Sequence, residues 1–378
     1  MKNKILVGLT LAILTSILCI HVVNKNYYYK TLWYNLPGIF DGNIFYSRKI
    51  NKSTIPYSWP YSIDYKVHVS TALFDTLTKY DAISVLFIQH DSILVEQYFD
   101  GATQETRSNS FSMSKSFVGA LIGRAIRLGL IESIDQPVSE FLKEFKEGDK
   151  RKITIRHLLT MSSGLGWDEA YSSLFSQTTE AYYGTDLKKL VLELPAVKPP
   201  GKYFEYKSCD TEILALIIEQ ATSMSLSKFL EKELWQPMGA SDATWSLDHE
   251  DGIEKAYCCM YATPKDFARL GALYLYQGNW KGNQLIDSMY ISQSITATRL
   301  LNPLTEQPTD YYGFQWWILP NYKGLSVFYM RGILGQNVVV IPSLDMIVVR
   351  LGHKRGDKVN MHYTEMYALL DEALKMQK

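Results

Sequence analysis

Hydrophobic positions follow a strand-like pattern near both ends of the chain. The stretch AISVLFIQHDSILVEQYFDG, residues 82–101, contains two β-rich apolar runs that flank His90-Asp91-Ser92 and predict a β-hairpin. Toward the C-terminus, LSVFYMRG, GQNVVVIP and DMIVVRLGH are further β-rich runs, and a helix is expected from about Met361. Strands are therefore predicted at both ends.

The middle of the chain has the pattern of helices. Residues 111–128 are apolar on most of a helical circumference, which predicts a helix buried at the centre of the fold. From residue 131 to about 250 the patterns are helical and loop-like, as in EILALIIEQATSMSLSKFLEKEL. This order predicts an α+β fold, with one sheet lobe assembled from both chain ends and a helical lobe inserted between them.

The first residues have the features of a membrane segment. Lys2 and Lys4 precede the uncharged run Ile5–Val23, which is long enough to cross a bilayer. No small-x-small cleavage site follows this run, and Leu18 before Cys19 is not a small residue. We predict a membrane anchor at residues 1–23, with a cleaved signal peptide as the alternative.

Two further parts of the chain are predicted after the anchor. Residues 24–66 are rich in Tyr, Trp, Pro and Asn without clear periodicity, and we expect an extended segment that wraps the domain surface. Residues 67–378 form the predicted catalytic domain.

Charge and cysteine content exclude some classes of function. The chain has 39 Lys+Arg and 39 Asp+Glu without a basic block, which argues against nucleic-acid binding. Cys19, Cys209, Cys258 and Cys259 contain no C-x-x-C pair, so a structural zinc site is not expected. We expect buried thiols; a disulfide between the adjacent Cys258 and Cys259 is a minor alternative, because bonding neighbours is strained.

The leading chemical signal is Ser112-Met113-Ser114-Lys115. Residues three apart on a helix are surface neighbours, so the Lys115 amine can reach the Ser112 hydroxyl. A lysine can activate a serine if desolvation lowers its pKa, and this helix is apolar enough to desolvate it. The motif is short, and a second copy with the same spacing begins at Ser225. There Ser225 has the features of a helix N-cap and Lys228 those of a solvated side chain.

Other hydrolase motifs are missing from the sequence. There is no G-x-S-x-G, which disfavours an α/β-hydrolase, and His249-Glu250 does not continue into H-E-x-x-H. His157, within ITIRHLLTMSSGL, is expected to be structural.

Seven blocks of residues follow one another in a recognisable order between about residues 41 and 374. They are FSMSKSF, ITIRHLLTMSSGLGWDE, PPGKYFEYKSCDTEILALIIE, WSLD, YATPKDFARLGALYLYQGNW, YGFQWWI and RGILGQNVVVIP. This order resembles that of serine β-lactamase-like hydrolases, most strongly the branch of class C β-lactamases and 6-aminohexanoate-oligomer hydrolases. The resemblance implies a β-lactamase/transpeptidase-like fold with an antiparallel sheet, and Ser112 as nucleophile.

The resemblance also assigns the second element of the site. Tyr206, in YKS, matches the tyrosine of the family's Y-x-N element and would act with Lys115 as the base for acylation. Ser208 stands where the family most often has Asn. Tyr203 lies just upstream, and only the motif frame distinguishes the two tyrosines.

The third element of the family falls on Ile333-Leu334-Gly335. Penicillin-active members have Lys or His, then Thr or Ser, then Gly, so this sequence departs from them at two positions. Gly335 would leave room for a substrate beside the strand. The backbone N–H groups of Ser112 and Gln336 would form the oxyanion hole, and such donors survive side-chain changes.

The loop after the second block supplies further candidates. If the resemblance holds, Trp167, Glu169 and Tyr171 lie near the cleft and contact substrate; the alternative is that they are ordinary loop residues. No metal or organic cofactor is implied.

The predicted protein is a membrane-anchored serine hydrolase of a small ester, amide or short peptide. The family places its catalytic domain outside the cytoplasm, or secretes it after signal cleavage. The alternatives are a D-alanyl peptidase or β-lactamase, and a non-catalytic binding or sensor module on a membrane stalk.

Overall fold

The computed structural model describes residues 27–34 and 36–377. The predicted anchor at Ile5–Val23 lies outside these residues, so it stays a prediction. Within the described residues, no single helix has the length and hydropathy needed to cross a membrane. Two consecutive helices, Ser208–Thr222 and Leu226–Trp235, meet that requirement only as a pair bent by 72°.

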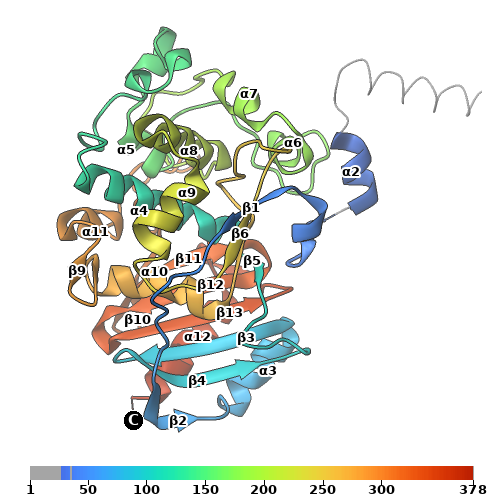
Figure 1. The fold of residues 1–378 in the computed structure, drawn as a ribbon, viewed down its shortest axis with the longest axis vertical. Coiled ribbons are helices and arrows are strands. Elements are labelled where there is room, and N and C mark those ends of the chain that lie inside the picture. The colour runs from blue at the N-terminus through green and yellow to red at the C-terminus, as the bar shows by residue number, and fades with distance from the viewer. Residues whose placement is uncertain (1–26, 35, 378) are drawn as a thin grey trace, which may run out of the picture.

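A seven-stranded sheet forms the lower lobe in Figure 1. Its order is β10-β11-β12-β13-β3-β4-β2, so strands from the two ends of the chain meet where β13 pairs with β3. All neighbours are antiparallel except β2 and β4, which are parallel. The predicted sheet is thus confirmed. Its strands are β2 (Tyr61–Lys66), β3 (Ala82–Gln89), β4 (Ser92–Tyr98), β10 (Trp317–Tyr322), β11 (Leu325–Gly332), β12 (Gln336–Ile341) and β13 (Met346–Gly352).

Alternating residues of the central strands serve two separate cores. Val338 and Val340 belong to the larger core, which contains α10 (Pro264–Leu275), whereas Val339 and Ile341 face the smaller core with α3 (Thr71–Lys79) and α12 (Thr364–Lys375). Because both faces are covered, these strands are apolar throughout instead of alternating with polar residues.

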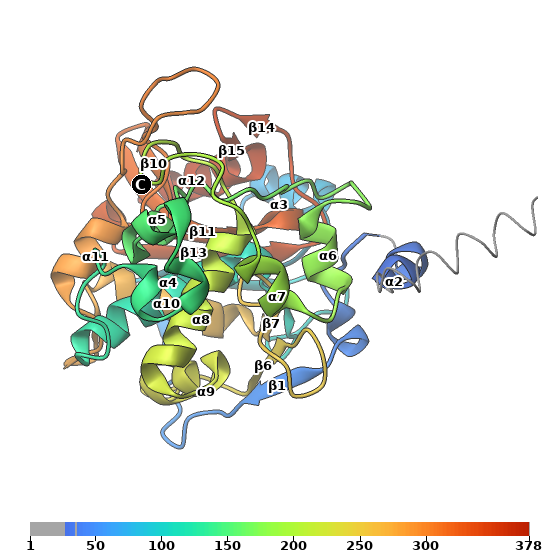
Figure 2. The same cartoon turned by 90° about the horizontal axis from the view of Figure 1, so that it is seen from above.

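The segment before the sheet is more regular than the sequence predicted. Within residues 24–66, expected to be extended, Tyr27–Tyr34 form the helix α2, and two strands join sheets. Figure 2 shows α2 outside the main body, on the side of α6 and α7. A small second sheet has the order β1-β6-β7-β5. Its strands are β1 (Ser47–Ile50), β5 (Ser108–Asn109), β6 (Ala243–Ser246) and β7 (Met260–Ala262).

The predicted helical lobe occupies the upper part of Figure 1. Its core helix α8 packs against α4, α5, α7 and α9. The α-helices not bounded above are α4 (Ser114–Arg127), α5 (Ile155–Leu159), α6 (Gln177–Tyr183), α7 (Leu187–Leu192), α8 (Ser208–Thr222), α9 (Leu226–Leu230) and α11 (Ser288–Ser294). Shorter helical turns are η1 (Asp41–Ile44), η2 (Phe111–Met113), η3 (Val138–Glu140), η4 (Lys143–Phe145), η5 (Gly148–Lys152), η6 (Glu231–Trp235), η7 (Ile333–Gly335) and η8 (Pro342–Leu344). Two short hairpins pair β8 (Asn279–Trp280) with β9 (Asn283–Gln284) and β14 (Lys358–Val359) with β15 (His362–Tyr363).

The expectation of buried thiols is wrong for two cysteines. Cys258 and Cys259 form a disulfide, while Cys209 is a buried thiol. The disulfide between adjacent cysteines, given only as a minor alternative from the sequence, is accompanied by a left-handed backbone at Cys259, where φ is 68°. Cys19 lies outside the described residues.

Candidate active site

The predicted nucleophile lies on a tight turn between β5 and α4. Phe111, directly before Ser112, has φ of 42°, an uncommon conformation for a bulky residue that is found at functional turns. The Asn109 side chain holds this turn, because its Oδ1 accepts hydrogen bonds from the backbone N–H of Phe111 at 2.8 Å and of Cys259 at 3.1 Å. Sequence reasoning missed Asn109, which belongs to no motif.

Lys115 lies in the first turn of α4, directly behind Ser112. Its Nζ is 2.9 Å from Ser112 Oγ and donates to the Tyr257 carbonyl at 2.8 Å. Only 1% of the Lys115 surface is exposed. This burial lowers the pKa of Lys115 to about 8, although the negative charges of Glu169 and Glu212 act in the opposite direction. The predicted Ser–Lys pair is therefore brought together.

Tyr206 lies beside Ser112 and Lys115, whereas Tyr203 does not. The Lys115 Nζ is 5.1 Å from the centre of the Tyr206 ring, whereas the Tyr203 hydroxyl donates to Glu306 at 2.9 Å. Burial raises the pKa of Tyr206 above its ordinary value, and the hydrogen bond with Ser112 lowers it in part. The tyrosine that the motif frame selected is the one beside Ser112.

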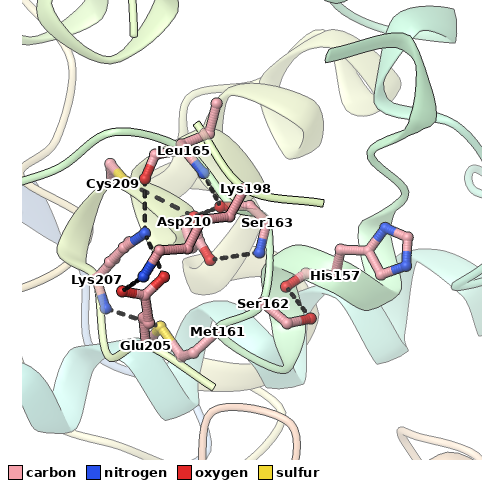
Figure 3. Close-up of polar contacts among 10 residues, drawn as sticks. All are labelled: His157, Met161, Ser162, Ser163, Leu165, Lys198, Glu205, Lys207, Cys209 and Asp210. Atoms are coloured by element: carbon pink, nitrogen blue, oxygen red, sulfur yellow. Dashed lines mark hydrogen bonds and ion pairs between the residues drawn. The ribbon is translucent and has the colours of Figure 1, made fainter. Parts of the chain in front are cut away.

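Buried polar groups fix the segment that carries Tyr206 (Figure 3). The Lys207 ammonium donates to the Leu165 carbonyl at 2.6 Å and pairs with Glu205 at 3.1 Å. Asp210 accepts from the Ser163 hydroxyl at 2.5 Å, and burial raises the pKa of Asp210 to about 7. These contacts tie the start of α8 to the loop that follows α5.

Glu169 organises the predicted substrate-side residues around its carboxylate. It accepts from the Tyr171 hydroxyl at 2.6 Å, the Trp167 indole at 2.6 Å, and the Ser208 hydroxyl and backbone N–H at 2.7 Å each. Ser208, which replaces the family's Asn, is therefore used to hold Glu169. Tyr171 and Ser208 line the cavity at Ser112.

The third element packs beside the nucleophile. Ile333 and Leu334 line the same cavity as Ser112. Gly335 does not leave room for substrate as expected, because a Cβ there would lie 2.1 Å from the Arg350 guanidinium. Arg350, buried and missed by the sequence reasoning, donates to the carbonyls of Leu334 and Gly335 at 3.0 and 2.8 Å.

Gln336 is the first residue of β12, and its side chain is tied to the neighbouring strand. The Nε2 donates to the Gly352 carbonyl at 2.7 Å, and the Oε1 accepts from the Gly352 N–H at 3.1 Å. This pairing fixes the backbone whose N–H was predicted for the oxyanion hole.

Gly332 is the last residue of β11 and lies directly against the turn that carries Ser112. A Cβ at this position would lie 2.4 Å from the Ser110 carbonyl oxygen and 3.1 Å from the Cβ atoms of Phe111 and Gln336. No side chain larger than hydrogen fits without moving the turn. Sequence reasoning did not single out this glycine, although it is the second residue of the last matching block.

We expect Gly332→Ala to lower kcat/KM for an ester on the order of 10²-fold, because displacements of about 1 Å at a reacting group can have that effect. The protein should still fold, since the clash is confined to one turn. Steady-state kinetics and circular dichroism check this, with Ser326→Ala on the exposed side of β11 as control. Wild-type kinetics in Gly332→Ala would show that the turn tolerates the shift.

The other sequence candidates have structural roles. Ser225 caps α9 by accepting from the Lys228 N–H at 3.3 Å, as predicted. The exposed Lys228 ammonium pairs with Glu231. The His157 Nδ1 accepts from the Thr154 N–H at 3.1 Å. Within the described residues, no cluster of His, Cys, Asp and Glu is arranged to hold a metal ion.

Comparisons with known proteins agree with this arrangement. A family model described as Beta-lactamase matches residues 71–372. A 6-aminohexanoate-dimer hydrolase of Paenarthrobacter ureafaciens is 28% identical over 284 residues, covering 70% of this chain and 71% of that protein. Esterase EstB of Burkholderia gladioli is 28% identical over 153 residues, covering 37% and 38%. A solved structure from Bacillus anthracis, assigned as a 6-aminohexanoate-dimer hydrolase, has a TM-score of 0.75 at 21% identity and covers 90% of this chain and 92% of its own.

Proposed function

The chain belongs to the beta-lactamase family of hydrolases, as the ordered sequence blocks predicted, and from this premise we propose that it cleaves esters or amides through an acyl-enzyme on Ser112. The observation that carries the proposal is the distance of 2.9 Å between Lys115 Nζ and Ser112 Oγ, with the amine buried. A hydroxyl needs such a base to become a nucleophile.

The proposed proton transfers follow from the charges in the site. With a pKa of about 8, Lys115 is neutral in a minority of molecules at pH 7 but far more often than an exposed lysine, and the neutral amine can accept the Ser112 proton. The raised pKa of Tyr206 keeps its phenol protonated, so it relays a proton to the leaving group. The backbone N–H groups of Ser112 and Gln336 stabilise the oxyanion. Water then attacks the acyl-enzyme and releases the acid.

The proposed substrate is a small ester, amide or short peptide. Relatives include a 6-aminohexanoate-dimer hydrolase and an esterase, and the same fold occurs in a penicillin-binding protein from Bacillus halodurans. Panels of p-nitrophenyl esters, short amides and D-amino-acid peptides test the proposal. A protein that turns over none of these would contradict it.

We expect a preference for neutral esters or amides over cephalosporins. Ile333 and Leu334 supply neither the cation nor the hydroxyl that holds a β-lactam carboxylate in penicillin-active relatives, and a carboxylate buried without such partners is costly. Arg331 stacks on Trp317 at 3.3 Å and donates to the Met361 carbonyl. The remaining cationic candidate, Arg355, lines the cavity but is exposed, so water weakens its attraction for an anion.

The measurement is kcat/KM for a neutral ester and for a chromogenic cephalosporin on one preparation, in wild type and in Arg355→Ala. A higher value for the cephalosporin would contradict the preference. If that advantage disappears in Arg355→Ala, Arg355 is the missing carboxylate partner.

We also propose that residues 5–23 anchor the protein in a membrane, with the catalytic domain outside the cytoplasm. We expect the expressed full-length protein to remain with membranes through alkaline carbonate washing and to keep its uncleaved mass, because Ile5–Val23 is uncharged and lacks a cleavage site. Fractionation and intact-mass measurement check this. A soluble product trimmed near residue 24 would identify a signal peptide instead.

A further inference from the structure

A cavity of about 300 Å³ opens at Ser112, and its surface is mostly apolar. Its volume is at the lower end of the range for small-ligand sites. Its apolar lining includes Phe111, Ile333 and Leu334. Leu36 and Leu174 also line it.

The threonines of the cavity wall present little polarity to a ligand, because their hydroxyls bond to the main chain. Thr31 donates to the Tyr27 carbonyl at 2.9 Å, Thr178 to that of Asp168 at 2.9 Å, and Thr179 to that of Ser173 at 2.7 Å. Apolar contact is therefore the main interaction that this wall offers.

Part of the wall precedes the family domain. Leu36 and Pro37 line the cavity, whereas the family match begins at residue 71. The helix α2 lies against α6, and the Tyr28 ring contacts that of Phe175 with centroids 5.9 Å apart. The segment before the matched domain thus contributes to the wall of this cavity.

The position of the cavity indicates which part of a substrate it takes. Ser112 lines it, but Lys115 and Tyr206 do not. In the proposed mechanism Tyr206 protonates the leaving group, which then departs on the Tyr206 side of Ser112. Because Tyr206 does not line the cavity, the apolar wall beside Ser112 is left for the acyl group.

We propose that this cavity binds the acyl chain, and that the preferred substrates are esters with an apolar acyl group of medium length. The inference rests on the proposed function and specifies its substrate class. Each methylene transferred into an apolar site contributes ~0.8 kcal/mol, which corresponds to about fourfold in kcat/KM.

The test uses the full-length chain and p-nitrophenyl esters from acetate to decanoate. We expect kcat/KM to rise about fourfold per methylene until the cavity is filled. Leu36→Asp, at a position with 66% exposure, should reduce the ratio of octanoate to acetate turnover by tenfold or more. Leu304→Asp is the matched control, since Leu304 is 91% exposed and does not line the cavity.

A second measurement separates this inference from the proposed catalysis. Equilibrium binding of p-nitrophenyl octanoate to Ser112→Ala should be weakened by adding Leu36→Asp and unchanged by adding Leu304→Asp. If esters are hydrolysed but kcat/KM depends neither on acyl chain length nor on Leu36→Asp, the cavity does not bind the acyl chain, although the protein is still a hydrolase. Octanoate binding that depends on Leu36, without any turnover, would support the cavity and overturn the catalysis.

Discussion

Replacing Ser112 with alanine is expected to lower kcat for ester hydrolysis by on the order of 10⁴ or more. The substitution removes the only atom that can form the proposed acyl bond, so no part of the covalent route remains. The fold should persist, because the side chain fills little volume and its hydroxyl bonds to Lys115 and Tyr206 within the site. Steady-state kinetics and a thermal melt on the same preparation check both statements.

The second S-x-x-K motif supplies the matched control. Ser225→Ala removes the N-cap of α9 and should lower the free energy of unfolding by about 1 kcal/mol while leaving kcat unchanged. Equal loss of turnover in both variants would undo the assignment of the nucleophile.

Removing the base has the second-largest expected effect. We expect Lys115→Met to lower kcat by on the order of 10² or more, because it replaces the buried amine beside Ser112 with an apolar group of similar length. In wild type, kcat/KM should rise with pH through about 8, since only the deprotonated amine can accept the serine proton. A pH profile that is unchanged in Lys115→Met would remove the lysine from the mechanism.

Tyr206 acts with Lys115 as one proton-transfer unit, so the effects of losing each need not add. Tyr206→Phe should also lower kcat by on the order of 10², whereas Tyr203→Phe should not, because Tyr203 contacts Glu306 away from Ser112. A fully active Tyr206→Phe variant would show that another residue relays the proton.

The fold was predictable where the signal was periodic or repeated along the chain. The β3–β4 hairpin and the last three strands have long apolar runs, and helix α4 is apolar around its circumference. The helix Tyr27–Tyr34 was missed because its residues are mostly aromatic and show no helical period.

The site residues that belong to sequence motifs could be predicted. The residues that hold those motifs in place could not. Ser112 and Lys115 are three apart in sequence, whereas Asn109, Arg350 and Gly332 act through backbone contacts that no local pattern reveals. The role of Gly335 was misjudged because the side chain that fills its space comes from a neighbouring strand.

The most direct test of the account is the location of a covalent adduct. The purified full-length protein is treated with a fluorophosphonate, digested, and sequenced by tandem mass spectrometry. We expect one modified residue, Ser112, with labelling that is lost in Ser112→Ala and slowed in Lys115→Met. An adduct on another serine, or a correctly folded protein that remains unlabelled, would contradict the assignment of Ser112 as the nucleophile.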